Sequence, residues 1–512
     1  MRRRDYLRTA GLGLMLVAFF QALAMAGEPA RSPNILFIMS DDHTTQAIGA
    51  YGGRLATLNP TPNIDALAKN GMRFEQVFCN NAICTPSRAS IMTGQYSQRN
   101  GVLDLRGRLP AQKQYLPMEM KKAGYQTAMI GKWHLHHEPA AFDYYSVLPG
   151  QGKYHNPDFR IRGDKPWPKN TIQKTGMHSS DAITDVSLDW LKNKRNKEQP
   201  FFLMHHFKAP HDLFENAKRY DSYLAEVKIP EPFNLLNPPD GSAATRGMGS
   251  GVGRSHAPWT LAKKLGVPEQ LDDLSYAQAG YQKYLKRYLR CVKGVDDNVK
   301  RLIEYLRETG ELQNTVVIYT SDQGFFLGEH DLMDKRWIYE ESMRMPFIVH
   351  WPNGVAKGSV NDWLINNTDF APTMLDLAGV ESTPDYMQGH SFAAALKGAD
   401  KPDNWREVTY YRYWMHLAHS LAVPAHFGIR GERYKLIFFY GCTPNGKKQT
   451  PVAWEFYDLK TDPHEMHNQY ANPEYAKTIA DMKLKLKRIR MDLNETDEKY
   501  PSIQKIIDSN WH

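Results

Sequence analysis

Three strand-like segments constrain the fold of this chain most strongly. They span 34–39, 200–207 and 314–320, are largely apolar, and each is followed directly by polar residues. Segments that are apolar on both faces are typical of strands buried inside a parallel sheet. Helical periodicity separates them, over residues 61–71, 178–194 and 271–308. The pattern therefore predicts parallel strands covered by helices, in a chain of 512 residues that is long enough for one large core and a smaller second unit.

Acidic and amide side chains follow the first and third of these segments. Asp41 and Asp42 come after 34–39, and Asp322 and Gln323 come after 314–320. Open α/β sheets place their sites at the carboxyl ends of strands. Two adjacent carboxylates repel each other unless a cation lies between them. We therefore favour a site for a hard cation, Ca²⁺ or Mg²⁺ rather than zinc, over an ordinary polar loop.

A cysteine precedes the next predicted helix. In the run Cys84-Thr-Pro-Ser-Arg88, Pro86 suits a first helical turn and Gly94 is a natural stop. The positive end of the helix dipole and Arg88, one turn further on, would favour a thiolate or a bound anion at Cys84. A small core cysteine before an ordinary helix is an equally good interpretation of the spacing.

Two histidines and a lysine are candidates for moving protons and binding an anion. Lys132 and His134 lie two residues apart at the end of a short predicted strand, so they share one side. His211 follows the segment 200–207 and is a candidate general acid. Taken alone, such residues are more often solvated or structural.

The extended run from Cys84 to Gly94 resembles the signature of the type I sulfatases. In that family a separate enzyme reads the Cys-x-Pro-x-Arg core and oxidises the cysteine to formylglycine. The resemblance recurs at Asp41-Asp42, at Gly131-Lys-Trp-His-Leu135, at Asp322-Gln323 and near Lys335, so it spans essentially the whole mature chain. It implies an alkaline-phosphatase-like α/β fold: a large, mostly parallel or mixed central sheet flanked by helices, plus a small C-terminal antiparallel sheet with one helix.

The resemblance also implies a role for each motif residue. One Ca²⁺ would be held by Asp41, Asp42, Asp322, Gln323 and the converted Cys84. Charge on the sulfuryl group would be stabilised by Lys132, Lys335 and Arg88. His211 would protonate the leaving alcohol, and His134 would take a proton from the hydrated aldehyde. Gln323 replaces the more usual Asn but keeps a carbonyl ligand. His136 and His137 stand where a Gly is usual, so the local turn is expected to differ.

The substrate is expected to be an anionic sugar. The formal net charge of the chain is +8. Residues 1–26, a predicted signal peptide, contribute +3 through four arginines and one aspartate. The rest of the chain therefore carries about +5, which suits an anionic partner. A long irregular insertion, 230–258, resembles a substrate lid. We expect sulfate removal from a polysaccharide or glycosaminoglycan, with a 6-sulfated N-acetylhexosamine as the leading substrate. Candidate substrate-binding residues are His256, His416, His419, His426 and Arg430.

Three alternatives remain open from the sequence. The first is an arylsulfatase of broad specificity, and the second is a phosphonate or phosphodiester hydrolase of the same superfamily. The third is a sulfated-glycan-binding protein in which Cys84 stays unconverted. No basic run with interleaved aromatic residues is present, so nucleic acid is not an expected partner.

The N-terminus carries an export signal. Arginines precede an apolar stretch and a small-x-small cleavage site, which predicts a signal peptide over 1–26. Arg3-Arg4 also resembles a twin-arginine signal, with an ordinary secretory signal as the alternative. We expect a periplasmic or secreted bacterial protein with no membrane span in its mature part, and with a maturase and the export machinery as partners. Its catalytic domain is predicted at 27–404 and its C-terminal subdomain at 405–512. No disulfide can be assigned among Cys79, Cys291 and Cys442.

Overall fold

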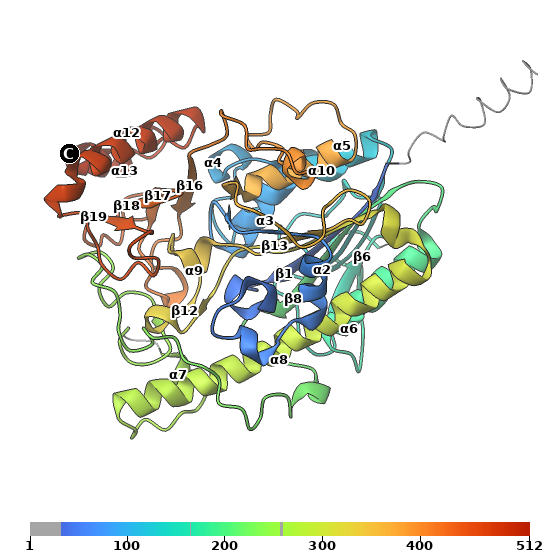
Figure 1. Cartoon of the computed structure of the whole chain (residues 1–512), viewed down its shortest axis with the longest axis horizontal. Helices are drawn as coiled ribbons and strands as arrows, with labels where there is room; N and C mark the ends of the chain where they lie inside the picture. Colours follow the sequence, from blue (N-terminus) through green and yellow to red (C-terminus); the bar gives the residue numbers. More distant parts are fainter. Residues whose placement is uncertain (1–31, 164, 257–259) are drawn as a thin grey trace, which may run out of the picture.

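A ten-stranded mixed sheet forms the centre of the molecule. The computed structural model describes residues 32–163, 165–256 and 260–512 (Figure 1). The strand order is β14-β2-β13-β10-β1-β8-β4-β5-β6-β7, and the five from β10 to β5 run parallel. These central strands are β1 (Asn34–Asp41), β4 (Gln126–Lys132), β5 (Tyr144–Leu148), β8 (Phe201–Pro210) and β10 (Thr315–Ser321). The predicted large, mixed sheet is confirmed.

Strand β1 shows why the sheet needs helices on both faces. Successive side chains of a strand point to opposite faces of the sheet, and all eight residues of β1 are buried. Both faces of the sheet must therefore be covered. Ile35 and Phe37 join one core with helices α3 (Cys84–Thr93), α5 (Tyr115–Lys122) and α10 (Phe370–Leu377). Leu36 and Ile38 join a second core with α2 (Pro62–Lys69), α6 (Ser179–Asp189) and the long α8 (Asp273–Glu308), which crosses the molecule in Figure 1.

Several boundaries differ from the sequence prediction. The helix expected over 178–194 ends as α6 at Asp189 and continues as a π-helical turn, Trp190–Lys194. The segment 150–170, whose sequence has no apolar periodicity, contains β6 (Asp158–Ile161), which extends the sheet with β7 (Thr171–Gln173). Only one residue of β6 is buried, so its sequence shows no alternation of apolar and polar residues that is long enough to predict a strand. The outer strands on the other side are β2 (Met72–Phe74), β13 (Phe347–His350) and β14 (Ser359–Asn361).

A separate four-stranded antiparallel sheet lies near the C-terminus, as predicted. Its strands are β16 (Val408–Tyr413), β17 (His426–Gly431), β18 (Tyr434–Phe439) and β19 (Ala453–Asp458). The expectation of a single helix beside it was wrong. Helix α12 (Ala476–Asp492) is followed by α13 (Pro501–Asn510), and both pack against the sheet. Pro501 suits the first turn of α13, since it has no N–H to leave unpaired.

The insertion 230–258 is mostly irregular in its described part. Its one strand, β9 (Ser250–Gly251), pairs with β12 (Leu332–Asp334), which leads directly to Lys335. Among the described residues, no helix is long and apolar enough to cross a membrane. All four cysteines are buried and unpaired. The predicted signal peptide at 1–26 and the last two residues of the insertion, 257 and 258, lie outside the described residues.

Candidate active site

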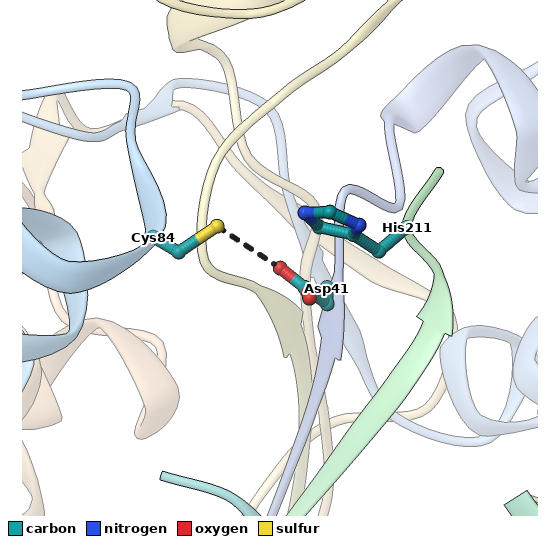
Figure 2. A group of neighbouring side chains, drawn as sticks. All are labelled: Asp41, Cys84 and His211. Atoms are coloured by element: carbon teal, nitrogen blue, oxygen red, sulfur yellow. Dashed lines mark hydrogen bonds between the residues drawn. The ribbon is translucent and has the colours of Figure 1, made fainter. Parts of the chain in front are cut away.

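The carboxyl ends of β1 and β8 meet the start of helix α3. Figure 2 shows Asp41 at the tip of β1, His211 just after β8, and Cys84 as the first residue of α3, with the three side chains turned toward one another. The Cys84 thiol donates a hydrogen bond to Oδ1 of Asp41 over 3.3 Å. Residues 43 to 170 positions apart in the sequence are thus brought together by the parallel sheet, as the sequence predicted from the strand ends.

Helix α3 begins and ends as its sequence predicts. The preceding residue, Ile83, is extended, and Gly94 adopts a left-handed conformation with φ of 65°. Arg88 lies one turn into the helix, and its Nη1 donates a 2.6 Å hydrogen bond to the main-chain oxygen of Lys132. Cys84 is only 1% exposed. Burial and the charge of Asp41 hold the pKa of this thiol well above its usual range, so a reactive thiolate is not favoured here.

Three buried carboxylates gather beside Cys84. Oxygens of Asp41, Asp42 and Asp322 lie within 4.8 Å of one another. Each is paired with a cation: Asp41 with Lys132, Asp42 with Lys335 and Asp322 with Arg88. The Lys335 ammonium lies 2.6 Å from Oδ2 of Asp42. When all three carboxyl groups are ionised, their charges balance those of the three cations.

The carboxylates differ in how readily they ionise. Burial raises the pKa of Asp41, but Lys132, His211 and Arg88 outweigh it and hold that pKa well below its usual range. Burial, together with the charge of Asp41, raises the pKa of Asp322 to about 7. Burial also raises the pKa of Asp42. A bound cation would favour the ionised form of all three groups.

The donor set fits a hard divalent cation. Besides the three carboxylates, Oε1 of Gln323 is buried and has no hydrogen-bond partner among the described residues, while its Nε2 donates to Oδ1 of Asp42. An orphaned amide oxygen beside a cluster of carboxylates is explained by a cation that it would ligate. Oxygen ligands of this kind suit Ca²⁺. The predicted metal residues Asp41, Asp42, Asp322 and Gln323 are therefore brought together.

Lys132 lies between the cysteine and an unexpected partner. Its ammonium lies 3.8 Å from Sγ of Cys84 and 2.5 Å from Oε1 of Gln151. Gln151 was missed from the sequence, because a single glutamine in a loop has no spacing that marks it. This hydrogen bond to the amide orients the Lys132 side chain toward the site.

His134 is set up to accept a proton. The side chain is buried, Nδ1 has no hydrogen-bond partner among the described residues, and burial together with Lys132 and Arg88 lowers the pKa well below its usual range. A neutral imidazole at pH 7 can act as a base. Its main-chain oxygen accepts a 3.0 Å hydrogen bond from the Thr85 hydroxyl, which ties it to α3. His136 has a φ of 63°, which explains why a glycine suits that position.

Lys208 is a second cation that the sequence did not reveal. It lies on β8, is 5% exposed, and its ammonium lies 4.5 Å from the ring centre of Tyr154. No ion pair of Lys208 occurs among the described residues. Burial and the charge of Lys132 lower its pKa to about 8. Its signal in the sequence was weak, because a lysine near the end of a strand is usually solvated.

Three of the predicted substrate-binding residues make close contacts within the fold. The His426 ring is fully buried and packs against Trp337 and Tyr411, because its position on β17 points inward. His416 bonds to the main chain at 425 and 448. Arg430 pairs with the carboxylate of Glu340, which is partly buried. These contacts engage the three side chains within the fold, and Arg430 also lines a cavity of about 530 Å³ with Glu340. Their part in substrate binding stays a prediction.

Two of the predicted substrate-binding residues remain candidates. His256 lines a cavity of about 200 Å³ under the insertion, together with Trp337 and Tyr339. Its Nε2 contacts the main-chain oxygen of His330 at 2.9 Å. His419 is exposed and close enough to Arg336 for that charge to lower its pKa, beside the effect of burial. Arg336 is the neighbour of Lys335 in the sequence, so His419 stays a candidate for substrate binding.

The fold and the site define a hydrolase of the alkaline-phosphatase-like superfamily. The sulfatase family model matches residues 33–380, and a model of the C-terminal region of N-sulphoglucosamine sulphohydrolase matches residues 328–492. The chain belongs to the sulfatase family, and it is a sulfuric ester hydrolase.

Several known proteins resemble it closely. It is 39% identical to the N-acetylglucosamine-6-O-sulfatase of Bacteroides thetaiotaomicron, over 92% of this chain and 88% of that one. The human N-acetylglucosamine-6-sulfatase is 28% identical, over 80% of this chain and 72% of its own. A structure solved in complex with its substrate, D-glucosamine-2-N,6-O-disulfate, superposes with a TM-score of 0.81 at 37% identity, over 92% of this chain and 100% of that one.

Proposed function

We propose that this sulfatase removes the 6-sulfate from a glucosamine or N-acetylglucosamine residue of a sulfated polysaccharide or glycosaminoglycan. The observation that carries the proposal is the 39% identity, over 92% of the chain, to an N-acetylglucosamine-6-O-sulfatase. The solved relative that binds glucosamine disulfate supports the same sugar. A net positive charge suits an anionic polymer.

We infer that Cys84 is converted to formylglycine, which supplies a hydrated aldehyde whose oxygen attacks sulfur. A maturase would read Cys84, Pro86 and Arg88 as its recognition core. Because Cys84 is 1% exposed in the folded chain, conversion would have to precede folding.

The acids and cations then have separate tasks. Asp41, Asp42, Asp322 and Gln323 would hold one Ca²⁺, which polarises a sulfate oxygen and favours the ionised form of the attacking hydroxyl when bound. With the cation added to a balanced set of side-chain charges, the site carries a surplus of positive charge that favours a sulfate ester. Lys132, Lys335 and Arg88 bind the sulfuryl oxygens, and their burial strengthens each interaction as charge develops.

Two histidines move the protons. Nε2 of His211 faces the site and lies 3.9 Å from Oδ2 of Asp42, so it can give a proton to the oxygen of the departing sugar alcohol. His134, neutral at pH 7, takes a proton from the second hydroxyl at position 84, which allows sulfate to leave and the aldehyde to return.

The site of action is proposed to lie outside the cytoplasm. Residues 1–26 would direct export to the periplasm or the medium, by a twin-arginine or a general secretory route. The catalytic part would be 27–404, followed by a subdomain at 405–512. The relatives include bacterial proteins, which is consistent with this assignment.

Release of inorganic sulfate tests the proposal. The mature, converted enzyme should release sulfate from N-acetylglucosamine-6-sulfate and from glucosamine-2-N,6-O-disulfate. It should act at least about ten-fold less well on the 3-sulfated isomer, because a misplaced ester loses the near-attack geometry. Cys84→Ala is the matched control and should release none. Preference for 4-nitrophenyl sulfate over every sugar would favour a broad arylsulfatase. Preference for a phosphonate monoester would favour the superfamily alternative, and tight glycan binding without any sulfate release would favour a binding protein.

A further inference from the structure

The two ring nitrogens of His211 face different surroundings. Nε2 points to the site, where it lies 3.9 Å from Oδ2 of Asp42. Nδ1 lies 2.7 Å from Oδ1 of the next residue, Asp212. Figure 2 shows the ring between the carboxyl ends of β1 and β8, turned toward Cys84. One nitrogen is therefore free to meet the substrate while the other is held by a carboxylate.

The main chain of His211 is also fixed. Its oxygen accepts a hydrogen bond from the Tyr154 hydroxyl, and its N–H donates to the Lys208 oxygen over 3.2 Å. With the backbone anchored on both sides, rotation about the side-chain bonds is the freedom that remains to the ring. Two oxygens of Asp212 are in position to remove it: Oδ1 of its carboxylate and its main-chain oxygen, each 2.7 Å from Nδ1 of His211. Only the carboxylate carries a charge that matches a protonated ring.

We propose that Asp212 is a positioning residue for the general acid. This inference rests on the role proposed above for His211. Asp212 accepts a hydrogen bond from Nδ1–H, which fixes the ring and leaves the second proton on Nε2. As the sulfur–oxygen bond of the ester breaks, the electron pair goes to the sugar oxygen and the Nε2 proton moves onto it. The ring becomes neutral and keeps Nδ1–H, so the hydrogen bond to Asp212 survives the step.

The charge state of Asp212 agrees with this arrangement. Burial alone raises the pKa of Asp212, but the hydrogen bond and the charge of His211 outweigh it and hold that pKa below its usual range. Asp212 is therefore an ionised acceptor at neutral pH. Its side chain is 38% exposed, so it is not needed to fill the core.

Asp212 has a second partner, Lys264, and the effects of its contacts with His211 and Lys264 must be distinguished. Its Oδ2 lies 3.9 Å from the ammonium of Lys264, in helix α7 (Leu261–Lys264). Asp212 could therefore anchor the segment that follows the insertion, rather than orient the ring of His211. A Lys264→Gln variant removes that pair and leaves the contact with His211 intact.

The experiment compares kcat and KM for sulfate release from the 6-sulfated sugar in converted enzymes. Asp212→Asn should lower kcat by about 10- to 100-fold, a part of the 10²–10⁴ that a general acid supplies, with KM changed less than about three-fold. Asp212→Glu should restore part of the rate. The matched control is Glu215→Gln, which removes an exposed carboxylate three residues further on and should keep the full rate.

A double-mutant cycle with His211→Gln gives the decisive result. If Asp212 acts through the histidine, Asp212→Asn should cost nothing further once His211 is replaced. An equal loss in both backgrounds, or the same loss in Lys264→Gln, would overturn the inference and assign Asp212 a structural role. A full rate in Asp212→Asn would also overturn it. If the unaltered enzyme releases no sulfate from the sugar, the proposed function fails instead, and the two failures are distinguishable.

Discussion

Arg88 and Asp322 form a buried ion pair across 234 positions of the sequence. Nε and Nη2 of Arg88 lie 3.0 and 2.8 Å from Oδ2 of Asp322, and the side chains are 2% and 0% exposed. The pair fastens the helix that begins with Cys84 to the carboxyl end of β10. The pair therefore holds the proposed nucleophile position beside the proposed metal-binding edge of the sheet.

Removing the arginine should destabilise the protein severely. Arg88→Ala leaves a buried carboxylate without its cation, which typically costs about 3–5 kcal/mol. The midpoint of urea unfolding should fall accordingly. Arg99→Ala, on the exposed end of a short helix, is the control and should change it little. A similar midpoint for both variants would contradict the importance of the pair.

The modification of Cys84 can be read from one tryptic peptide. The fragment Phe74–Arg88 contains Cys79 as an internal unmodified thiol. We expect residue 84 to be lighter than cysteine by about the mass of one water molecule and to resist alkylation, while Cys79 reacts. Full alkylation of Cys84 in protein from its native host would exclude the formylglycine mechanism.

Calcium should stabilise the folded chain as well as support its activity. A ligand present at 100 times its dissociation constant adds about 2.7 kcal/mol to the free energy of unfolding. We expect a chelator to lower the melting temperature and added Ca²⁺ to restore it. Asp322→Asn should abolish this response, whereas Asp385→Asn, a carboxylate on an exposed loop, should keep it. A response retained in Asp322→Asn would place the ion elsewhere.

Lys208 should make stability depend on pH in a defined window. Its pKa is lowered to about 8 in the folded protein, so between about pH 8 and its unfolded pKa near 10.4 the unfolded chain binds more protons. Stability should therefore rise with pH through this window. Lys208→Met removes the cost of burying the charge and should stabilise the protein by roughly 1–3 kcal/mol at pH 7.

The comparison near pH 10 provides the check on Lys208. There the advantage of Lys208→Met over the unaltered protein should shrink, because the lysine of the folded protein is neutral. The exposed Lys218→Met should show no advantage at either pH. A constant gain at both pH values would attribute the effect to packing rather than to charge.

Replacing His419 should change substrate binding, whereas replacing His426 should change stability. His419 is exposed beside Arg336, so His419→Ala should raise KM by about five-fold, the effect of one lost hydrogen bond, without changing the melting temperature. His426 is buried, so His426→Ala should cost about 1–3 kcal/mol of stability and leave KM unchanged. The reverse pattern would restore His426 to the pocket and remove His419 from it.

Much of the site was predictable because its signals are local. The buried strands β1 and β10 are apolar on both faces, and the acids that follow them are adjacent in the sequence. Pro86 and Gly94 mark the limits of α3, and they place Cys84 at its first turn. Parallel pairing then brings these ends together without further information.

The sequence by itself determined the α/β class, the sulfatase motifs and the residue types that the chemistry needs. Only the tertiary structure decided which other side chains reach the site. Gln151 and Lys208 lie near it, and Asp212 contacts His211, whereas the His426 ring packs against Trp337. Each of these outcomes depends on which distant segments pack together. A local pattern of apolar and polar residues does not encode such contacts, because they arise only when the sheet and its helices assemble.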